Sequence, residues 1–232
     1  FVFSYYCSMK TIAHIHSDFP TKFGIPRQSG IIDSLKATIV FEPDYRNVEA
    51  LRGIEGYDYL WLIWQFSENV RQEWSPTVRP PRLGGNKRVG VWATRSPFRP
   101  NALGLSSVRL LSVDLHSPDG PVLHIQGADL MDGTPIFDIK PYIPFTDSHP
   151  EARSGFVNTF PGHQVEVECS ESLLSVLPEP LRQPLIEVLA CDPRPSYHSD
   201  PTRRYVIPFA SYEVAFKVEG NQLVVLEIVP VR

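Results

Sequence analysis

Short runs of alternating apolar and polar residues recur along this chain, and residues that favour turns separate them. Alternation with a period of two is typical of β-strands that bury one face. The first part of the chain contains seven candidate strands, at residues 9–16, 37–41, 57–66, 89–93, 106–115, 122–128 and 136–139. Only residues 46–52 predict a helix in this part, and Gly53 would terminate it. So many strands with so little helix predict a mainly β fold that closes, or nearly closes, into a β-barrel.

The pattern changes after about residue 145. The polar stretch DSHPEARSGFVNTFPGH has no clear period, which is typical of a linker. A helical pattern follows at 184–190, and residues 212–218 and 223–229 flank a turn and predict a hairpin. We therefore predict two domains: a β-barrel over residues 9–148, and a linker with a small α+β domain over residues 149–232.

The segment from Arg79 to Gly104 contains five arginines and one lysine and no acidic residue. Four prolines and several glycines interrupt it, so it predicts rigid, irregular loops around one short strand. Residues 71–109 carry eight basic residues and the single acid Glu73, a net charge of +7 in a chain of net charge −4. A basic face on an acidic body favours a phosphate or polyanion ligand at one defined site.

Other features narrow the class of protein. The three cysteines, at positions 7, 169 and 191, are odd in number and far apart, which argues against a disulfide framework or a zinc cluster and favours a reducing cytoplasm. The residues before Met9 lack a secretory pattern, and no apolar run is long enough to span a membrane. We expect the functional start near Met9, preceded by an extension of little consequence.

Common cofactor motifs are missing from the sequence. Neither a G-x-G-x-x-G fingerprint nor a P-loop occurs, so a nucleotide cofactor must bind in another way. His14, His16 and Asp18 have the residue types of metal ligands, but one face of a strand explains them better, and we predict no metal site. DPRPSY at 192–197 only superficially resembles the Asp-Pro-Pro-aromatic motif of amino-methylating enzymes, because it has an inserted residue.

Two groups of residues are candidates for chemistry. Arg95 and Arg99 flank Ser96-Pro97-Phe98, and arginine side chains in a rigid loop suit carboxylates and phosphates. The second group is the stretch 129–135, DLMDGTP, followed by Asp138, Lys140 and Tyr142. An ordinary turn at Asp132-Gly133 explains part of this stretch, and a turn can also bind a ligand.

Four long segments resemble the TsaA/TrmO family: IPRQ at 25–28, VEALRGIEGYDYLWLIWQF at 48–66, WSPTVRPPRLGGNKRVGVWATRSPFRPNALGLS at 74–106 and DLMDGTPIFDIKPYIPF at 129–145. DPRPSY and the final hairpin also resemble the small C-terminal domain of the bacterial form. The resemblance implies a methyltransferase barrel without a Rossmann sheet, which uses S-adenosylmethionine and acts on tRNA. It further implies methylation of the exocyclic nitrogen of threonylcarbamoyladenosine next to the anticodon of threonine tRNAs, and a homodimer.

The resemblance also implies where the cofactor binds. By position, the cofactor-binding residues are Pro26, Arg27, Gln28, Ser67, Glu68, Arg95, Leu105, Asp132, Gly133, Thr134 and Pro135. Arg95 suits the methionine carboxylate of the cofactor, and Leu105 suits its adenine. For catalysis, Asp132 or Asp138 is a candidate acceptor of the proton that the nitrogen loses. The alternative, in which Asp132 caps a turn and Asp138 pairs with Lys140, stays open.

The basic segment is the predicted RNA surface. We expect RNA to contact Arg79, Arg82, Lys87, Arg88, Phe98 and Arg99, with Trp74 or Trp92 as further stacking candidates. We expect Trp92 to be half-buried on a strand and Phe98 to be the better exposed ring. Two other functions remain: a noncatalytic tRNA-binding adaptor, and a methyltransferase that acts on a small molecule or a protein.

Overall fold

The computed structural model describes residues 9–69, 73–83, 86–159, 164–194 and 200–231. Six strands close a barrel in the order β1-β2-β7-β6-β3-β8, and every neighbouring pair is antiparallel. These strands are β1 (Ala13–His16), β2 (Lys36–Phe41), β3 (Tyr59–Gln65), β6 (Leu103–Asp114), β7 (Val122–Gln126) and β8 (Pro135–Pro141). The predicted mainly β fold with a closed barrel is confirmed.

The strand alternation determines which side chains fill the barrel. In β3, Leu60, Leu62 and Trp64 are buried and alternate with half-exposed residues. Gly104 on β6 pairs with Trp64, and Ser106 pairs with Leu62. A Cβ atom at Gly104 would lie only 2.2 Å from Cε2 of Trp64, so the missing side chain makes room for the indole ring. This end of the barrel therefore combines a large ring with small and polar neighbours.

Two predicted elements differ from the structure. In place of one helix at 46–52 there are three short 3-10 turns: η1 (Pro43–Tyr45), η2 (Val48–Leu51) and η3 (Ile54–Gly56). Gly53, with a φ of 87°, reverses the chain between the last two turns. The predicted strand at 89–93 reaches only Gly90 as β5 (Val89–Gly90), and η6 (Val91–Ala93) follows it. β5 pairs with β4 (Thr77–Val78) in a two-stranded sheet outside the barrel, and only Val91 of the run 89–93 is fully buried.

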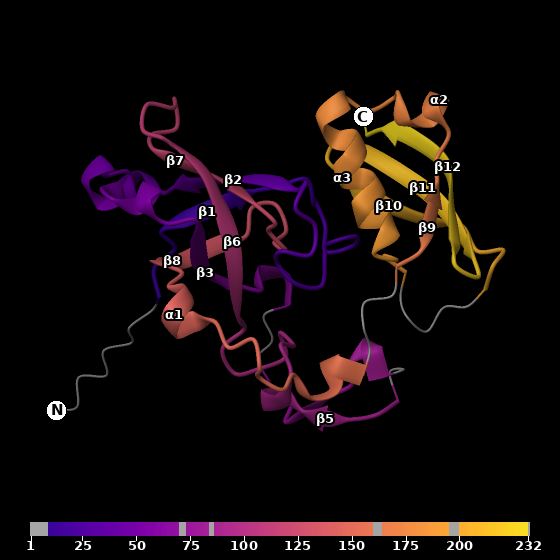
Figure 1. The fold of residues 1–232 in the computed structure, drawn as a ribbon, viewed down its shortest axis with the longest axis horizontal. Helices are drawn as coiled ribbons and strands as arrows, with labels where there is room; N and C mark the ends of the chain where they lie inside the picture. The colour runs from indigo at the N-terminus through magenta and orange to yellow at the C-terminus, as the bar shows by residue number, and fades with distance from the viewer. Residues whose placement is uncertain (1–8, 70–72, 84–85, 160–163, 195–199, 232) are drawn as a thin grey trace.

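The basic segment forms an irregular layer at one end of the barrel, around β5 in Figure 1. It also includes η5 (Pro81–Leu83), while η4 (Ser67–Asn69) lies just after β3. Backbone contacts hold this layer together: Val91 N–H donates to the carbonyl of Pro76 at 3.0 Å, and Ser75 N–H donates to that of Phe98 at 3.4 Å. The predicted irregular loops are therefore present around one short strand, β5, which pairs with β4 just before the segment.

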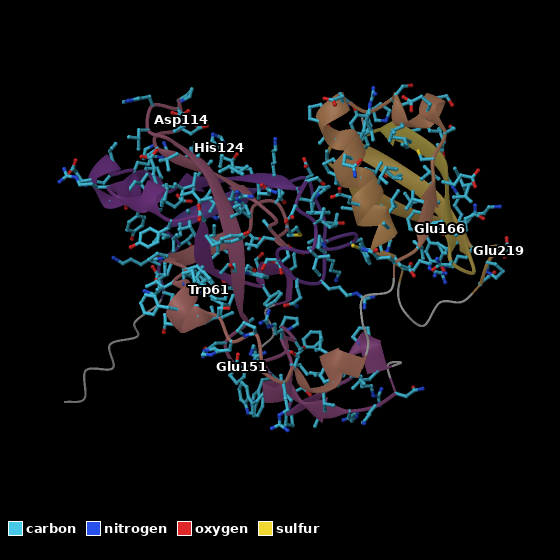
Figure 2. All side chains as sticks on the ribbon, in the orientation of Figure 1. Trp61, Asp114, His124, Glu151, Glu166 and Glu219 are labelled. Atoms are coloured by element: carbon cyan, nitrogen blue, oxygen red, sulfur yellow. The ribbon has the colours of Figure 1, made fainter. Side chains whose placement is uncertain are left out.

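The C-terminal part contains a four-stranded sheet in the order β10-β11-β12-β9. Its elements are β9 (Glu166–Glu168), α2 (Glu171–Leu174), α3 (Glu179–Ala190), β10 (Tyr205–Phe209), β11 (Tyr212–Glu219) and β12 (Gln222–Pro230). The predicted hairpin is present as β11 and β12, and the predicted helix begins earlier, at Glu179. The predicted linker contains α1 (Pro144–Asp147) and η7 (Gly155–Thr159). In Figure 2, Trp61 of β3 lies close to α1, and its indole N–H donates to Asp147 at 2.8 Å.

Buried apolar residues form two separate cores, one inside the barrel and one between α3 and the C-terminal sheet. The second core also takes Phe19, Ile32 and Leu35 from the connection between β1 and β2. Figure 1 shows this indigo connection extending from the barrel toward α3 and β10. A boundary between domains at residue 148 thus stays a prediction, since the C-terminal core uses residues from both sides of it. Within the described residues, no helix is both long and apolar enough to cross a membrane.

Candidate active site

A cavity of about 510 Å³ opens where β3 ends and β6 begins. Three separate segments contribute to its wall: the connection between β1 and β2, the loop before β6, and the loop between β7 and β8. Its lining residues are Lys22, Ile25, Pro26, Arg27, Gln28, Trp64, Gln65, Phe66, Ser67, Glu68, Thr94, Arg95, Pro97, Arg99, Leu103, Gly104, Leu105, Asp129, Met131 and Thr134. The wall thus combines apolar surface with arginines and a few acidic and amide groups, which is typical of a small-molecule site.

A chain of hydrogen bonds runs from the barrel core to this cavity. The indole Nε1–H of Trp64 donates to Oγ of Ser106 at 3.0 Å, and the Ser106 hydroxyl donates to Oδ1 of Asp129 at 2.6 Å. Ser106 is almost fully buried and does not line the cavity, whereas Asp129 does. Because Trp64 supplies a donor to Ser106, the serine hydroxyl is oriented to donate to the carboxylate.

Burial raises the pKa of Asp129 above the ordinary value of an aspartate. The hydrogen bond from Ser106, backbone hydrogen bonds and the positive charge of Arg95 act in the opposite direction without cancelling this effect. A carboxylate that is costly to ionise and lies in a cavity wall has a raised proton affinity, which suits the acceptance of a proton.

Eight of the eleven predicted cofactor residues line this cavity: Pro26, Arg27, Gln28, Ser67, Glu68, Arg95, Leu105 and Thr134. The Arg95 guanidinium donates to the side-chain carbonyl of Gln28, so the structure joins two residues that are far apart in the sequence. Leu105 is 52% exposed although it belongs to a barrel strand, which leaves its side chain available to a ligand. Their role in cofactor binding stays a prediction.

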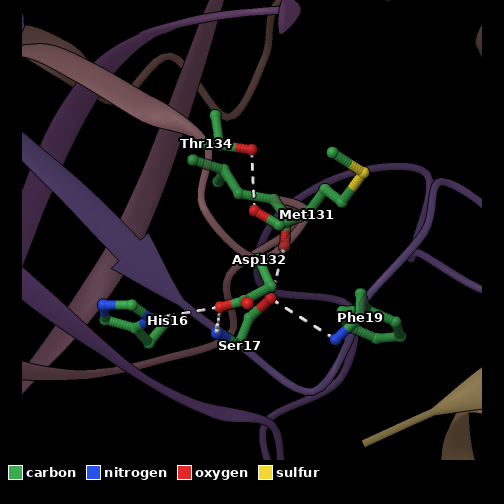
Figure 3. Close-up of polar contacts among 7 residues, drawn as sticks. His16, Ser17, Phe19, Met131, Asp132 and Thr134 are labelled. Carbon is green, nitrogen blue, oxygen red and sulfur yellow. Dashed lines mark hydrogen bonds and ion pairs between the residues drawn. The ribbon is translucent and has the colours of Figure 1, made fainter. Parts of the chain in front are cut away.

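The other three, Asp132, Gly133 and Pro135, do not line the cavity. Figure 3 shows Asp132 facing His16 and Ser17 instead. Its Oδ1 accepts the backbone N–H of Ser17 at 3.1 Å and lies 3.3 Å from Nδ1 of His16. Gly133 has a φ of 74° and forms the turn that returns the chain to β8. The structure thus has the turn-capping arrangement that the sequence left open for Asp132.

The second candidate base, Asp138, also lies away from the cavity wall. Its Oδ2 is 2.8 Å from the Lys140 ammonium, and its Oδ1 accepts the backbone N–H of Ile139 at 3.0 Å. Asp138 therefore forms the ion pair with Lys140 that is the alternative to a catalytic role. A catalytic role for Asp132 or Asp138 stays untested, and neither side chain has the position in the cavity wall that Asp129 has.

An aromatic platform adjoins the cavity on the predicted RNA surface. The rings of Trp74 and Trp92 stack with centroids 5.7 Å apart, and the Arg99 guanidinium lies 5.5 Å from the Trp92 ring centroid. Trp92 is 66% exposed, so the prediction that it is half-buried on a strand is wrong: it lies on η6, where only Val91 turns inward. Phe98 is half-buried, so it is not the better exposed ring.

The other predicted RNA contacts are basic residues of the same segment. Arg79, Lys87 and Arg88 are exposed, and the side chain of Arg82 lies outside the described residues. Arg99 is the residue shared by both sites: it lines the cavity, and its Nη1 donates to the backbone carbonyls of Thr94 at 3.0 Å and Ser96 at 3.1 Å. These bonds fix the guanidinium between the cavity and the exposed tryptophan.

Sequence reasoning did not select Asp129, Trp64 or Ser106 as site residues. Asp129 is the first residue of DLMDGTP, and its position directly after the predicted strand at 122–128 is the sequence signal that points to it. Ser106 and Asp129 are 23 residues apart in the sequence, and Trp64 and Ser106 are 42 residues apart. Only the closure of the barrel brings the three together.

The family comparisons agree with this architecture. Residues 14–148 match the family described as tRNA-methyltransferase O N-terminal domain, and residues 162–231 match the TrmO C-terminal domain. The chain is 37% identical to the tRNA (adenine(37)-N6)-methyltransferase of Escherichia coli strain K12, over 94% of this chain and 96% of that protein. It is 41% identical to the protein of the same name from Eikenella corrodens, over 76% of this chain and 99% of that protein.

A solved structure extends the likeness to three dimensions. The crystal structure of TrmO from Pseudomonas aeruginosa superposes with a TM-score of 0.77 at 32% identity, covering 96% of both chains. The relatives therefore match the barrel, the basic layer and the C-terminal sheet together rather than one of them. The chain belongs to the tRNA-methyltransferase O family.

Proposed function

We propose that this protein uses S-adenosylmethionine to methylate the exocyclic nitrogen of adenosine 37 in tRNA. The observation that carries the proposal is the 510 Å³ cavity, which adjoins an exposed aromatic and basic surface through Arg99. Two relatives are named tRNA (adenine(37)-N6)-methyltransferase, and another is named a putative S-adenosylmethionine-dependent methyltransferase. A small cofactor site beside an RNA surface is the arrangement that such a reaction requires.

The cavity residues fit the chemical parts of S-adenosylmethionine. Arg95 supplies a guanidinium for the methionine carboxylate, and Leu105 with Pro26 supplies apolar surface for the adenine ring. The Arg95–Gln28 hydrogen bond pre-positions the guanidinium. When bound, the cofactor supplies an electrophilic methyl group on a sulfonium, so the protein's main contribution is to hold the acceptor nitrogen in line with it.

The acceptor in this proposal is a threonylcarbamoylated adenosine of threonine tRNAs. The carbonyl attached to N6 makes the N6 proton more acidic than in plain adenosine, which eases its removal. Arg79, Lys87, Arg88 and the Trp74–Trp92 platform would hold the anticodon loop by phosphate contacts and by stacking. The protein would work in the cytoplasm as a homodimer.

Two other functions make different predictions. A noncatalytic adaptor would bind tRNA without affinity for the methyl donor. A methyltransferase for a small molecule or protein would leave the platform and its basic rim without a ligand. The lining of the cavity favours the methyltransferase over the adaptor, and the exposed stacked tryptophans favour RNA over a small acceptor.

The test uses purified protein, radiolabelled S-adenosylmethionine and two threonine tRNA preparations, one with and one without the threonylcarbamoyl group. We expect label only in the modified tRNA. Equal label in both preparations would contradict the proposed modified acceptor but keep the tRNA methyltransferase. Absence of label from both, with cofactor binding measured separately by calorimetry, would contradict the methylation of tRNA itself.

A further inference from the structure

The candidate active site contains a carboxylate with no evident structural partner of opposite charge in direct contact. Asp129 lies in the loop between β7 and β8, and the described residues form no ion pair with it within 4.0 Å. All its hydrogen-bond donors among the described residues are neutral: the hydroxyl of Ser106 and the backbone N–H groups of Asp129 and Ser29. Burial of a carboxylate without a salt bridge is costly, so its retention in a cavity wall calls for a chemical explanation.

Resting on the proposed function, we infer that Asp129 is the general base of the reaction and that Ser106 positions it. Two other acidic side chains were candidates, but Asp132 caps the turn beside Ser17 and Asp138 pairs with Lys140. Glu68 also lines the cavity, yet it is exposed to solvent. Asp129 alone among these acids combines a place in the wall with a fixed orientation from the barrel interior.

The proposed step is balanced in atoms and charge. The lone pair of N6 forms the bond to the methyl carbon, while the bond from that carbon to the sulfonium sulfur breaks and leaves its electron pair on sulfur. The proton of N6 passes to the Asp129 carboxylate. One cation and one anion thus become a neutral thioether and a neutral carboxylic acid, and the proton returns to water when the product leaves.

The surroundings of Asp129 suit this cycle. Lys22, Arg27, Arg95 and Arg99 line the same cavity, as does the acidic Glu68, and the positive charge of Arg95 lowers the pKa of Asp129. Burial has the larger effect and raises the pKa of Asp129. A base of raised pKa is a better proton acceptor, provided that it is still ionised at the working pH.

The first experiment compares Asp129→Asn with the wild type in the tRNA methylation assay. We expect kcat to fall about 100-fold or more, the usual scale of general base catalysis. The dissociation constant of S-adenosylmethionine, measured by calorimetry, should stay unchanged. Asp114→Asn is the matched control, since Asp114 lies at the opposite end of β6 from the cavity (Figure 2) and its carboxylate accepts a local bond from His116 N–H.

The second experiment measures the pH dependence of kcat. The wild type should lose activity as acid protonates Asp129, and Asp129→Asn should lack this decline. Ser106→Ala removes a hydrogen bond that lowers the pKa of Asp129, so its acid decline should move to higher pH. If Ser106 had only a structural role, Ser106→Ala would change the free energy of unfolding without changing the pH at which kcat declines in acid.

These experiments test the role of Asp129 as general base separately from the proposed tRNA methylation activity. Label in modified tRNA by the wild type supports the function, and retained kcat in folded Asp129→Asn would then overturn the base alone. Weakened cofactor binding at unchanged kcat would also overturn it and make Asp129 a binding residue. A wild type that methylates neither tRNA would overturn the function and this role together. If Asp129→Asn does not fold, the inference is overturned when the acid decline of kcat in Ser106→Ala occurs at the same pH as in the wild type.

Discussion

Gly104→Ala tests whether the close packing at the cavity end of the barrel holds the site together. The new Cβ would lie 2.2, 2.3 and 2.6 Å from Cε2, Cζ2 and Cδ2 of Trp64. Carbon atoms prefer separations of about 3.5–4.0 Å, so the indole ring must retreat by more than about 1 Å. Trp64 is 6% exposed and packs on Phe66 with ring centroids 4.3 Å apart, so the space for such a shift lies toward the cavity that it lines.

The expected loss of stability has two parts. Overpacking of a core costs about 1–3 kcal/mol. Displacement of the indole also breaks its hydrogen bond to Ser106, and an unsatisfied buried polar group costs about 1–3 kcal/mol. We therefore expect the free energy of unfolding to fall by about 2–6 kcal/mol, with weaker activity because Ser106 no longer holds Asp129 in place.

Urea unfolding followed by tryptophan fluorescence measures this loss, and the methylation assay measures its effect on the site. Gly56→Ala is the matched control, because nothing lies within 4 Å of a Cβ built there and its φ is not in the left-handed region. Unfolding of Gly104→Ala within about 0.5 kcal/mol of the wild type, the usual range of neutral surface changes, would refute the packing argument.

Three further predictions concern charge and stacking. Trp92→Ala should weaken tRNA binding about 5- to 150-fold, because stacking on one base contributes about 1–3 kcal/mol, while leaving urea unfolding nearly unchanged; unchanged tRNA affinity would place the RNA elsewhere. Lys87→Gln with Arg88→Gln should flatten the slope of log affinity against log salt by about 2, as two phosphate contacts are lost, and an unchanged slope in filter binding would show that these residues contact no phosphate. Burial raises the folded-state pKa of Asp129, so its stabilising effect is complete below the unfolded value of about 3.9 and is lost as pH rises through the folded pKa. Asp129→Asn should thus be more stable than the wild type near neutral pH and not at strongly acidic pH, and a gap in unfolding free energy that does not vary with pH would contradict the raised pKa.

The barrel could be predicted because its information is local. The alternation in residues 57–66 and 122–128 predicts which side chains point into the barrel, and the burial patterns of β3 and β7 agree with it. The run at 89–93 failed because a short alternating pattern does not say whether a neighbouring strand is available. Val91 is buried as expected, but the Trp92 ring stacks on Trp74 and contacts the Arg99 guanidinium instead of packing in the barrel.

The site was harder to predict than the fold. Its arginines could be recognised from the proline-rich segment, since cationic side chains in rigid loops indicate a ligand. Asp132 precedes Gly133 in a turn, and the turn explains the contacts of its carboxylate. Asp129 acquires its environment only from Ser106 and Trp64, which come from other strands. No local pattern could distinguish the two aspartates.

The connection between β1 and β2 explains why the C-terminal sheet matters to a cavity at the end of the barrel. This connection carries Pro26, Arg27 and Gln28, three residues of the cavity wall. Phe19 at its start packs edge-on against Phe209 with ring centroids 6.0 Å apart, and the backbone carbonyl of Asp18 accepts the N–H of Ala210 at 2.7 Å.

The far end of the same connection is held as well. Ile32 and Leu35 lie in the C-terminal core, and the Ser34 hydroxyl donates to Glu187 of α3 at 2.5 Å. Between these anchors, Ile25 packs against that core directly beside Pro26. A loop whose ends and centre are buried loses less conformational entropy when it binds a ligand than a free loop does. The C-terminal sheet therefore orders one wall of the cavity although none of its own residues lines it.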